Sequence, residues 1–589
     1  MMIFEAPAEL IDVAIIGAGW YGLKAARTYL DLEPSTNLAV FDGDDSVGGV
    51  WSKKRIYPNL VAQVGFGYFN YPGTPMSQDW RPDNNLVSGA MIQQYLEDFA
   101  INSGIKPHIR FNSWVEKAER CPRGWRLKVN GRFIEAKKMI IATGVTSVPN
   151  ETPFKVEQGA IVSHSRDIAT NLDDLKTTEH VVVVGAAKSA YDAVYLLCSL
   201  GKQVTWIIRP NGSGPMPIMP HEIAGINTIT MGSTRLMTYL SPSMFNTRTW
   251  LGSFFHRTFM GRWLTSAHWD FITYMSEKAA GFGEAGSIES LKPDLEQSCF
   301  WCDSSLGLIT ITDFWDTLKK GNLNVVRDNV EVAKKGSVLL QSGKEIKCDY
   351  VLSATGWGDH FAFLSPELKE ELGIPAYGGN HDGDDGKKGS FWYAHDKAAE
   401  ESVAKSIPLL RGGPKQDKWH PDRKPTKRRW RLYNRCIPLD CARAGDRSLA
   451  ILGQIHTTQT PTIAGIQSLW AISYMLGEID LPDENTMIKE VSEYLAWVRM
   501  RYGSVGERYP YALFDWIGYL DRLLKEMGLK SRRKSNFISE YLSPYGPHTY
   551  ADYLTEYIAR RPSKGARLNG QIFHDKATTA SSNSSDVTI

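Results

Sequence analysis

Three glycines near the N-terminus have the spacing of a dinucleotide-binding turn. Gly17, Gly19 and Gly22 follow the apolar run Leu10 to Ile16, and Asp42 comes 20 residues after the third glycine. In such a turn the first glycine permits a tight bend, the second lets backbone approach a pyrophosphate, and the third lets the helix pack on the strand. Amide groups at the helix start donate to the phosphates, and a carboxylate after the next strand accepts from ribose hydroxyls. The sequence therefore predicts a dinucleotide site here.

A second glycine turn, Gly-Ala-Ala-Lys-Ser-Ala, begins at Gly185 after the apolar run Val181 to Val184. It keeps the first glycine and replaces the other two with alanine. Lys188 and Ser189 open the following helix and are candidates for holding phosphates. Arg209 ends the next strand, where an acidic residue would repel a 2′-phosphate and a guanidinium would pair with it. The second site is therefore predicted to take NADPH, with an ordinary surface cation as the alternative role for Arg209.

The segments that must position these two turns alternate between strand and helix patterns, which predicts an α/β fold. Residues 211–305 lack strand periodicity and predict a helical insertion. The C-terminal region is aromatic and helical in pattern, and the final stretch is of low complexity. The predicted units are a first dinucleotide-binding domain at 1–150 completed by 331–480, a second at 151–330, a helical extension at 481–561 and a disordered tail at 562–589.

Charge, apolar runs and cysteine usage limit the classes of function. The net charge of +2 over 589 residues recruits neither nucleic acid nor an anionic membrane. No run of 18 apolar residues and no basic leader is present, so neither a spanning helix nor a signal peptide is expected. Seven cysteines, an odd number, leave a free thiol and favour a reducing, cytoplasmic location.

Two segments could contact a further partner, such as RNA, a lipid surface or the substrate. The basic stretch Gly412 to Arg435, with Trp419, Trp430 and Tyr433, could meet RNA or lipid, although a solvated loop is the preferred interpretation. Apolar residues from Leu251 to Trp263 have helical spacing and could form a substrate lid or an interfacial helix, although a packed core is preferred. Membrane association is thus left open without being indicated.

Several motifs across residues 10–480 resemble, in the same order, those of the flavin-containing monooxygenases, particularly their fungal relatives. The first glycine turn is followed by Gly-Gly-Val-Trp, which contains Gly49 and Trp51. Two Ala-Thr-Gly segments follow, at 142–144 and 354–356, and a closing Leu-Ala-Ile-Leu-Gly begins at Leu449. The resemblance adds Gly49, Trp51, Thr143, Thr355 and Gly356 to the candidate cofactor-binding residues.

The resemblance implies two interleaved Rossmann-like domains, one for FAD and one for NADPH. It also implies that NADPH reduces FAD, dioxygen adds at flavin carbon 4a, and the resulting peroxide transfers one oxygen atom to a small organic substrate, as in secondary metabolism. No metal is required. Gln63 stands where the family carries an active-site asparagine, so it is the candidate catalytic amide. A family signature is only partly matched: Phe154, Gly159 and His164 are present at longer spacings, and Ile168 replaces an aromatic residue.

Two other functions remain as alternatives. A flavin disulfide reductase would need a cysteine pair, and Cys299/Cys302 and Cys436/Cys441 are the candidates. The loop Val47 to Ser52, where large reductases carry that pair, contains no cysteine. A zinc site is disfavoured because the two pairs lie 134 residues apart without paired histidines. A non-catalytic nucleotide-binding protein is the other alternative, and the substrate, the type of oxygenation and the oligomeric state stay open.

Overall fold

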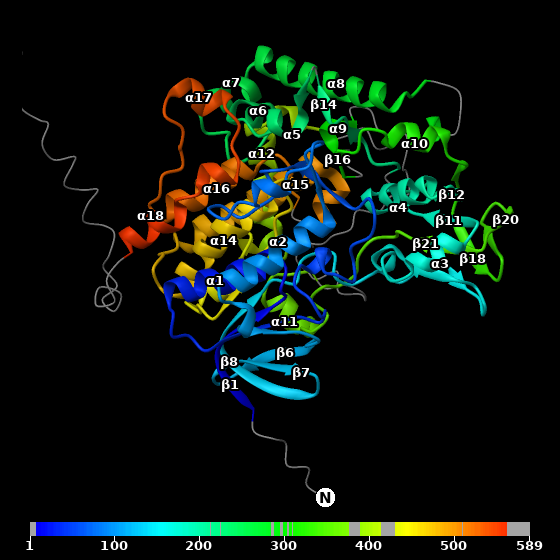
Figure 1. The fold of residues 1–589 in the computed structure, drawn as a ribbon. Helices are drawn as coiled ribbons and strands as arrows, with labels where there is room; N and C mark the ends of the chain where they lie inside the picture. Colours follow the sequence, from blue (N-terminus) through cyan, green and yellow to red (C-terminus); the bar gives the residue numbers. More distant parts are fainter. Residues whose placement is uncertain are drawn as a thin grey trace, which may run out of the picture.

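The computed structural model describes residues 8–561 apart from short internal segments. The segments left out are 213, 224, 284–287, 295–297, 303–304, 309, 376–388, 414–429 and 509–510. The predicted disordered tail at 562–589 and Trp419 of the basic stretch therefore lie outside the described residues. Figure 1 shows two α/β units side by side, with the helices of the insertion and of the C-terminal extension around the upper part of the molecule.

The first unit is built on a seven-stranded sheet in which five strands run parallel. Its order is β5-β2-β1-β8-β7-β6, and β24 pairs with the end of β8. The last three strands, β6 to β8, form an antiparallel meander. β24 enters the sheet from far along the chain, as the predicted interleaving requires. The strands are β1 (Glu9–Ile16), β2 (Leu38–Phe41), β5 (Ile109–Arg110), β6 (Val115–Cys121), β7 (Gly124–Val129), β8 (Arg132–Ile141) and β24 (Leu449–Ile451).

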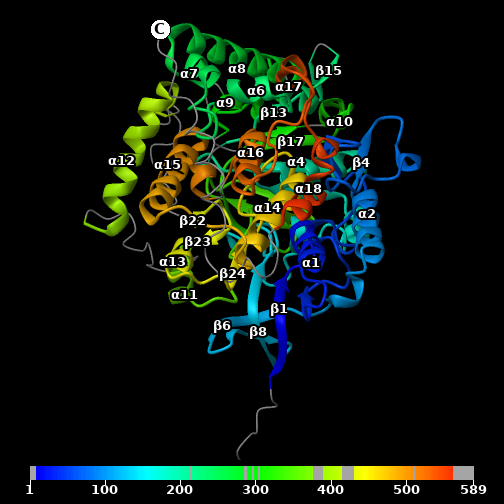
Figure 2. The same cartoon turned by 90° about the vertical axis from the view of Figure 1, so that its left-hand side faces the viewer.

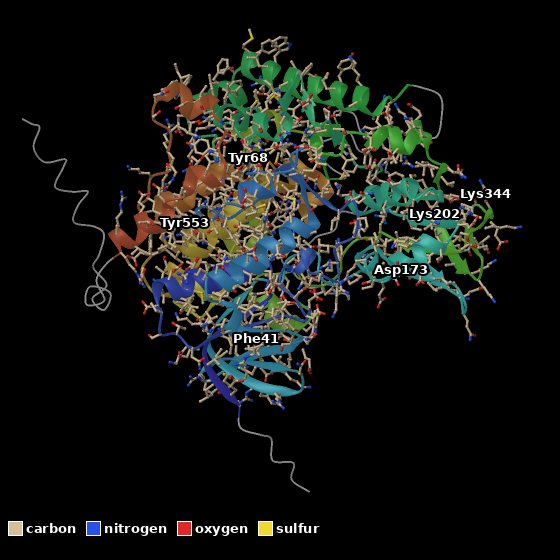
Figure 3. The ribbon with its side chains drawn as sticks, in the orientation of Figure 1. Phe41, Tyr68, Asp173, Lys202, Lys344 and Tyr553 are labelled. Carbon is tan, nitrogen blue, oxygen red and sulfur yellow. The ribbon has the colours of Figure 1, made fainter. Side chains whose placement is uncertain are left out.

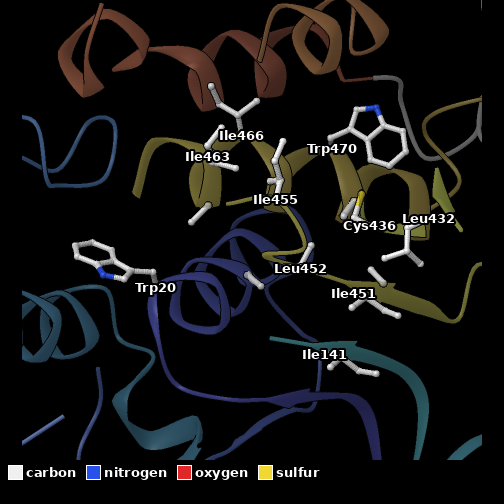
Figure 4. Packing of buried hydrophobic residues seen from close by; sticks show 14 of the residues in the cluster. Trp20, Ile141, Leu432, Cys436, Ile451, Leu452, Ile455, Ile463, Ile466 and Trp470 are labelled. Carbon is white, nitrogen blue, oxygen red and sulfur yellow. The ribbon is translucent and has the colours of Figure 1, made fainter. Parts of the chain in front are cut away.

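Two helices that lie side by side cover this sheet. They are α1 (Trp20–Leu32) and α14 (Thr460–Met475), and α14 is buried from Pro461 to Met475. Figure 4 shows Ile141 and Ile451 on neighbouring strands. Leu452 and Ile463 lie between these strands and α14, to which Ile463 belongs. Because α14 is buried on every face, it lacks the apolar stripe of a surface helix, and only tertiary packing stabilises it.

The second unit has a parallel five-stranded sheet in the order β10-β21-β11-β12-β17. Its core is separate from the core that the first unit shares with the insertion and the extension. β21 pairs with β11, so this unit extends to residue 353, and the return to the first unit predicted at 331 is too early. The strands are β10 (Val162–His164), β11 (His180–Val184), β12 (Gln203–Ile208), β17 (Leu323–Arg327) and β21 (Tyr350–Ser353).

A smaller sheet and two helices complete the second unit. The sheet has the order β20-β19-β18-β9 and packs against the parallel sheet through residues such as Val182 and Val338. The helix after the second glycine turn is α4 (Lys188–Ser199), and α10 (Phe314–Lys320) packs against it. The small-sheet strands are β9 (Lys155–Val156), β18 (Val330–Lys334), β19 (Ser337–Leu340) and β20 (Glu345–Lys347).

The insertion is mainly helical, as predicted, but it also contains short strands. β13 (Ile218–Met219) pairs with β16 (Gly307–Leu308), and β14 (Glu222–Ile223) pairs with β15 (Ile226–Asn227). Strands of two residues carry no alternation, so no periodicity could reveal them. The helices are α5 (Thr228–Gly232), α6 (Arg235–Leu240), α7 (Trp250–Arg257), α8 (Phe259–Ala280) and α9 (Ser298–Trp301).

The C-terminal extension is helical and is joined to the insertion by a buried ionic cluster. Arg235 on α6 donates to Glu540 at 2.7 Å and also pairs with Asp521. Figure 2 shows the extension next to α6 and α14. No helix of the described residues is long and apolar enough to cross a bilayer. The helices are α15 (Glu484–Arg508), α16 (Trp516–Glu526), α17 (Phe537–Leu542) and α18 (Tyr553–Arg560).

Candidate active site

The residues predicted to bind the first nucleotide meet at one edge of the first sheet. Gly17 follows β1, Asp42 follows β2 and Thr143 lies just beyond β8. These strands run parallel, so their carboxyl ends lie at the same edge. Ligands of open α/β sheets bind in the crevice outside that edge. The structure therefore brings together residues that are more than a hundred positions apart.

The three glycines of the first turn have different surroundings. Gly17 has φ of +106°, and a Cβ there would lie 2.5 Å from the carbonyl oxygen of Ala142. A Cβ on Gly22 would lie 1.7 Å from the carbonyl oxygen of Gly17. A Cβ on Gly19 would meet nothing closer than Gly49, at 3.7 Å. Gly17 and Gly22 are thus required by the protein's own packing, whereas Gly19 leaves room for a ligand.

Asp42 is buried beside this turn. One carboxylate oxygen accepts a hydrogen bond from the backbone N–H of Ala18 at 2.5 Å, and the other accepts from Asp44 at 2.9 Å. Burial raises the pKa of the Asp42 carboxyl to about 6, although these two bonds act in the opposite direction. The carboxylate therefore supports the turn and still has lone pairs for a ribose hydroxyl.

Three further side chains after strands of this sheet or before α14 have buried polar atoms without a hydrogen-bonding partner. They are the hydroxyl of Thr143 and the amide groups of Gln454 and Gln459. Gln454 follows β24 closely, and Gln459 directly precedes α14. An unpaired buried polar group costs about 1–3 kcal/mol, so these atoms point to a polar ligand in the crevice. Donors, acceptors and the open space at Gly19 all fit a flavin dinucleotide.

Sequence analysis missed Gln454 and Gln459 because only the neighbouring strand and helix had been recognised. The available signal was the presence of two amide residues just after the closing strand, between an apolar run and a helix. Such amides can donate to and accept from a pyrimidine ring. Gly49, which was predicted, lies opposite Gly19 with φ of +61°, and Trp51 makes an edge contact with Phe69.

The second glycine turn repeats the packing of the first. Gly185 has φ of +139°, and a Cβ there would lie 2.4 Å from the carbonyl oxygen of Ala354. Gly17 has the same relation to Ala142, so each turn packs against the alanine of an Ala-Thr-Gly segment. α4 begins at Lys188, and no side chain caps its N-terminus. The geometry therefore provides a second site for an anionic group.

The other residues predicted for the second nucleotide lie at the carboxyl edge of the second sheet. Arg209 directly follows β12 and is exposed to solvent. Thr355 and Gly356 follow β21, and the Thr355 hydroxyl pairs with Ser353 at 2.9 Å. Lys188 forms an ion pair with Asp192 on its own helix, and Ser189 is half-buried in the first turn.

The partly matched family signature lies at the junction between the two units. The ring of His164 contacts the carbonyl oxygen of Gly356 at 3.1 Å and packs edge-on against Trp357. Arg55 of the first unit donates to the carbonyl of Thr146 and lies over the same tryptophan ring. Phe154 and Ile168, also part of the signature, are buried. These residues hold the crossover between the units in position.

Gln63, the candidate catalytic amide, lies on the short strand β3 (Val61–Gly65). Its side-chain oxygen accepts a hydrogen bond from the backbone N–H of Leu308 at 2.8 Å. The neighbouring Ala62 carbonyl accepts from the hydroxyl of Thr310 at 3.1 Å. β3 of the first unit is thus attached to the segment that leaves the insertion.

A cavity lies between the insertion, the loop before α14 and the C-terminal extension. Its empty volume, part of which is open to solvent, is about 550 Å³. Thr458 forms part of its wall, between Gln454 and Gln459 in the sequence. Its lining residues are Met219, Thr228, Ile229, Met231, Gly232, Ser233, Met237, Ser241, His268, Trp269, Ile272, Thr458 and Phe514.

The surroundings of the cysteines disfavour the reductase alternative without excluding it. All seven are free thiols, and both candidate pairs are buried. Burial raises the pKa of Cys441 to about 11 and that of Cys436 well above its usual range, which disfavours the reactive thiolate. Figure 4 shows Cys436 among apolar side chains beside Trp470. Among the described residues no group of three or more metal-ligating side chains is found.

The basic stretch and the aromatic segment of the insertion both differ from what the sequence analysis preferred, which was a solvated loop and a packed core. Trp430 and Arg431, at the described end of the basic stretch, are buried, and Arg431 pairs with Asp396 at 2.9 Å. This part is therefore not a solvated loop. In the aromatic segment, Phe259 and Trp263 are 78% and 58% exposed, so the prediction of a packed core is wrong for these two residues.

The fold and the two glycine turns define a flavoprotein that binds two dinucleotides. A model of the pyridine nucleotide-disulphide oxidoreductase family matches residues 14–223. The FAD-dependent monooxygenase DEP4 of Alternaria brassicicola is 36% identical, covering 93% of this chain and 95% of its own. The FAD-dependent monooxygenase rstn6 of Aspergillus nomiae is 32% identical, covering 94% and 99%. The chain belongs to the family of FAD-dependent monooxygenases and is an oxidoreductase.

A solved structure has the same fold. The closed crystal structure of cyclohexanone monooxygenase matches with a TM-score of 0.54 over 94% of this chain and 98% of that one, at 15% identity. At this identity the match concerns the fold alone. This match confirms the predicted α/β fold class, and the relatives at 36% and 32% identity confirm the predicted family.

Proposed function

We propose that the protein uses NADPH to reduce FAD and then inserts one atom of dioxygen into a small organic substrate. The observation that carries this proposal is the repeated packing of a glycine turn against an Ala-Thr-Gly segment, at Gly17 and at Gly185. Two such turns in one chain provide adjacent sites for an electron donor and an electron acceptor. A structure titled cyclohexanone monooxygenase bound to NADP+ shares the fold, with a TM-score of 0.51.

When bound, FAD would supply the activation of dioxygen and the transfer of one oxygen atom to the substrate. The protein residues bind and orient the cofactor and keep water away. Gly19 and the start of α1 accommodate the pyrophosphate, Asp42 accepts from the ribose, and Gln454 and Gln459 pair with the flavin ring. Gln63 donates a hydrogen bond near the reacting atoms. Arg209 binds the 2′-phosphate of NADPH.

A purified sample tests the proposal directly. The protein is expected to carry flavin absorbance, to be bleached by NADPH without oxygen, and to recover its colour when oxygen is admitted. NADH is expected to bleach it much more slowly. A colourless protein that cannot be reconstituted with FAD, or one that NADPH does not bleach, contradicts the proposal. Transfer of electrons to a disulfide substrate would instead support the reductase alternative.

The proposed cytoplasmic location rests on the low, odd number of cysteines in the sequence, because disulfides are rare in reducing compartments. The relatives from Alternaria and Aspergillus are fungal, which agrees with the proposed role in secondary metabolism.

A further inference from the structure

The cavity beneath α8 has a lining without a charged side chain. Of its lining residues, Met219, Ile229, Met231, Met237, Trp269, Ile272 and Phe514 are apolar. Methionine and aromatic side chains adapt to ligands of varied shape and supply large apolar contact areas. His268 is the one titratable group in this lining, and burial lowers its pKa to about 4, so it is neutral at physiological pH. A charged ligand would find no partner of opposite charge in this wall.

Two serine hydroxyls in the same lining have no hydrogen-bonding partner. Ser233 is 1% exposed and Ser241 is 2% exposed, and the hydroxyl oxygen of each is buried and unpaired. Both serines directly follow short helices, α5 and α6. Leaving such groups unpaired costs free energy that a ligand oxygen or nitrogen could recover. An apolar wall with a few unpaired polar groups is typical of a small-molecule site.

The position of the cavity connects it with the flavin edge. Thr458 lines it, and Thr458 lies one residue before Gln459, whose unpaired amide belongs to the flavin crevice. The opposite wall consists of α5, α6 and α8 of the insertion, which Figure 1 shows over the C-terminal helices. The loop from Gly453 to Gln459 therefore carries both a residue that lines the cavity and the two glutamines that we assign to the flavin crevice.

We propose that this cavity holds the substrate and that the substrate is an uncharged, largely hydrocarbon molecule with one or two hydrogen-bonding oxygen atoms. This inference rests on the proposed monooxygenase function. It gives the insertion a role, since its helices supply most of the wall. The hydroxyls of Ser233 and Ser241 orient the polar end of the molecule, and the methionine and aromatic side chains enclose the rest.

The test uses decan-2-one as a probe, because it has a long apolar body and one hydrogen-bond acceptor. Binding to the FAD-loaded protein is measured by calorimetry without NADPH, so that turnover is not needed. Gly232 lines the cavity, and a Cβ added there meets no atom within 4 Å, so Gly232→Leu fills the space without a backbone clash. The variant is expected to bind decan-2-one at least tenfold more weakly. The matched control is Ala279→Leu, on an exposed position of α8, which is expected to bind like wild type.

A second variant, Met231→Trp, fills the same space from another residue and covers the case in which Gly232→Leu fails to fold. Equal affinity in wild type and both filled variants, or no binding by the wild type, overturns the proposal. Flavin content and bleaching by NADPH are measured on the same samples. If these are normal while the cavity variants bind decan-2-one unchanged, the substrate site is wrong and the monooxygenase function stands. If flavin content or bleaching fails in the wild type, the proposed function itself is wrong.

Discussion

The side-chain oxygen of Gln63 accepts a hydrogen bond from the backbone N–H of Leu308 at 2.8 Å. An N–H group can only donate, so this bond determines the orientation of the amide: its oxygen faces Leu308 and its NH2 group faces away. The amide therefore keeps two donor hydrogens for another partner. Leu308 lies on β16, which pairs with β13 of the insertion, so the insertion helps to hold the donor that orients this amide.

The amide of Gln63 accepts a hydrogen bond through its oxygen and can donate through its NH2 group. The variant Gln63→Glu separates these two functions. A glutamate can still accept from Leu308, but at neutral pH it has no hydrogen to donate. We expect normal flavin content and normal reduction by NADPH, with product formation lowered roughly 100-fold and the electrons appearing as hydrogen peroxide. The measurement is the ratio of hydrogen peroxide released to NADPH consumed. An unchanged ratio would show that Gln63 has only a structural role, which Gln63→Ala would then reveal as a loss of stability.

The variant Gly19→Asp is expected to fold and to lose FAD. Gly19 is the N-cap residue of α1, its backbone is extended, and its Cβ position has room. Aspartate is a good N-cap residue, so the helix should be at least as stable. Its carboxylate would occupy and repel the pyrophosphate position. Flavin content and the melting temperature of the apoprotein are the two measurements. Gly131→Asp, in the hairpin between β7 and β8, is the control for added charge and should keep its flavin, although its φ of +74° predicts some loss of stability.

The variant Arg209→Ala is expected to change coenzyme preference. Charge-assisted hydrogen bonds contribute about 1.5–3 kcal/mol, so the Michaelis constant for NADPH should rise roughly 10- to 100-fold, with little change for NADH. The control is Lys202→Ala, which removes an exposed cation before β12 rather than after it. Figure 3 shows Lys202 and Lys344 on the outer side of the second unit, away from Phe41. The ratio of kcat/KM for NADPH and NADH is measured, and an unchanged ratio in Arg209→Ala would place phosphate recognition elsewhere.

FAD affinity is expected to depend on pH through Asp42. Burial raises the pKa of this carboxyl to about 6. The carboxylate, rather than the acid, accepts from the ribose, so FAD binding releases a proton below that pH. The dissociation constant should therefore fall about tenfold for each pH unit gained up to about pH 6, and level off above it. Titrating apoprotein with FAD across this range is the measurement. A similar slope in Asp42→Asn would assign the proton to another group.

The strand–glycine–helix units could be predicted from the sequence because their determinants lie within about thirty residues of one another. Gly17, Asp42 and Gly185 were all found in this way, and the structure places each at the carboxyl edge of its sheet. The boundary near residue 331 was misplaced because β21 joins the second sheet through pairing with β11, which is distant in sequence. Local pattern carries no information about that pairing.

The cavity could not be predicted for the same reason. Thr458 and Trp269 line one cavity although nearly two hundred residues separate them. Arg431 lies outside any helix or strand and is buried in an ion pair with Asp396, which belongs to α12 (Phe391–Ser406). The charge of Arg431 alone suggested an exposed position. Residue type and local spacing cannot distinguish a buried paired arginine from a solvated one.

The pairing of β24 with β8 has a consequence for the synthesis of the protein. Leu449 lies beside Met139, 310 positions earlier in the chain. A ribosome delivers β8 long before β24, and α14 follows later still, so the flavin crevice stays open during most of translation. Until β24 pairs with β8, the nascent chain exposes an unpaired edge of β8 and apolar surface, and both promote aggregation. Cofactor supply and chaperone binding should therefore matter most in the last quarter of translation, after residue 449 has emerged.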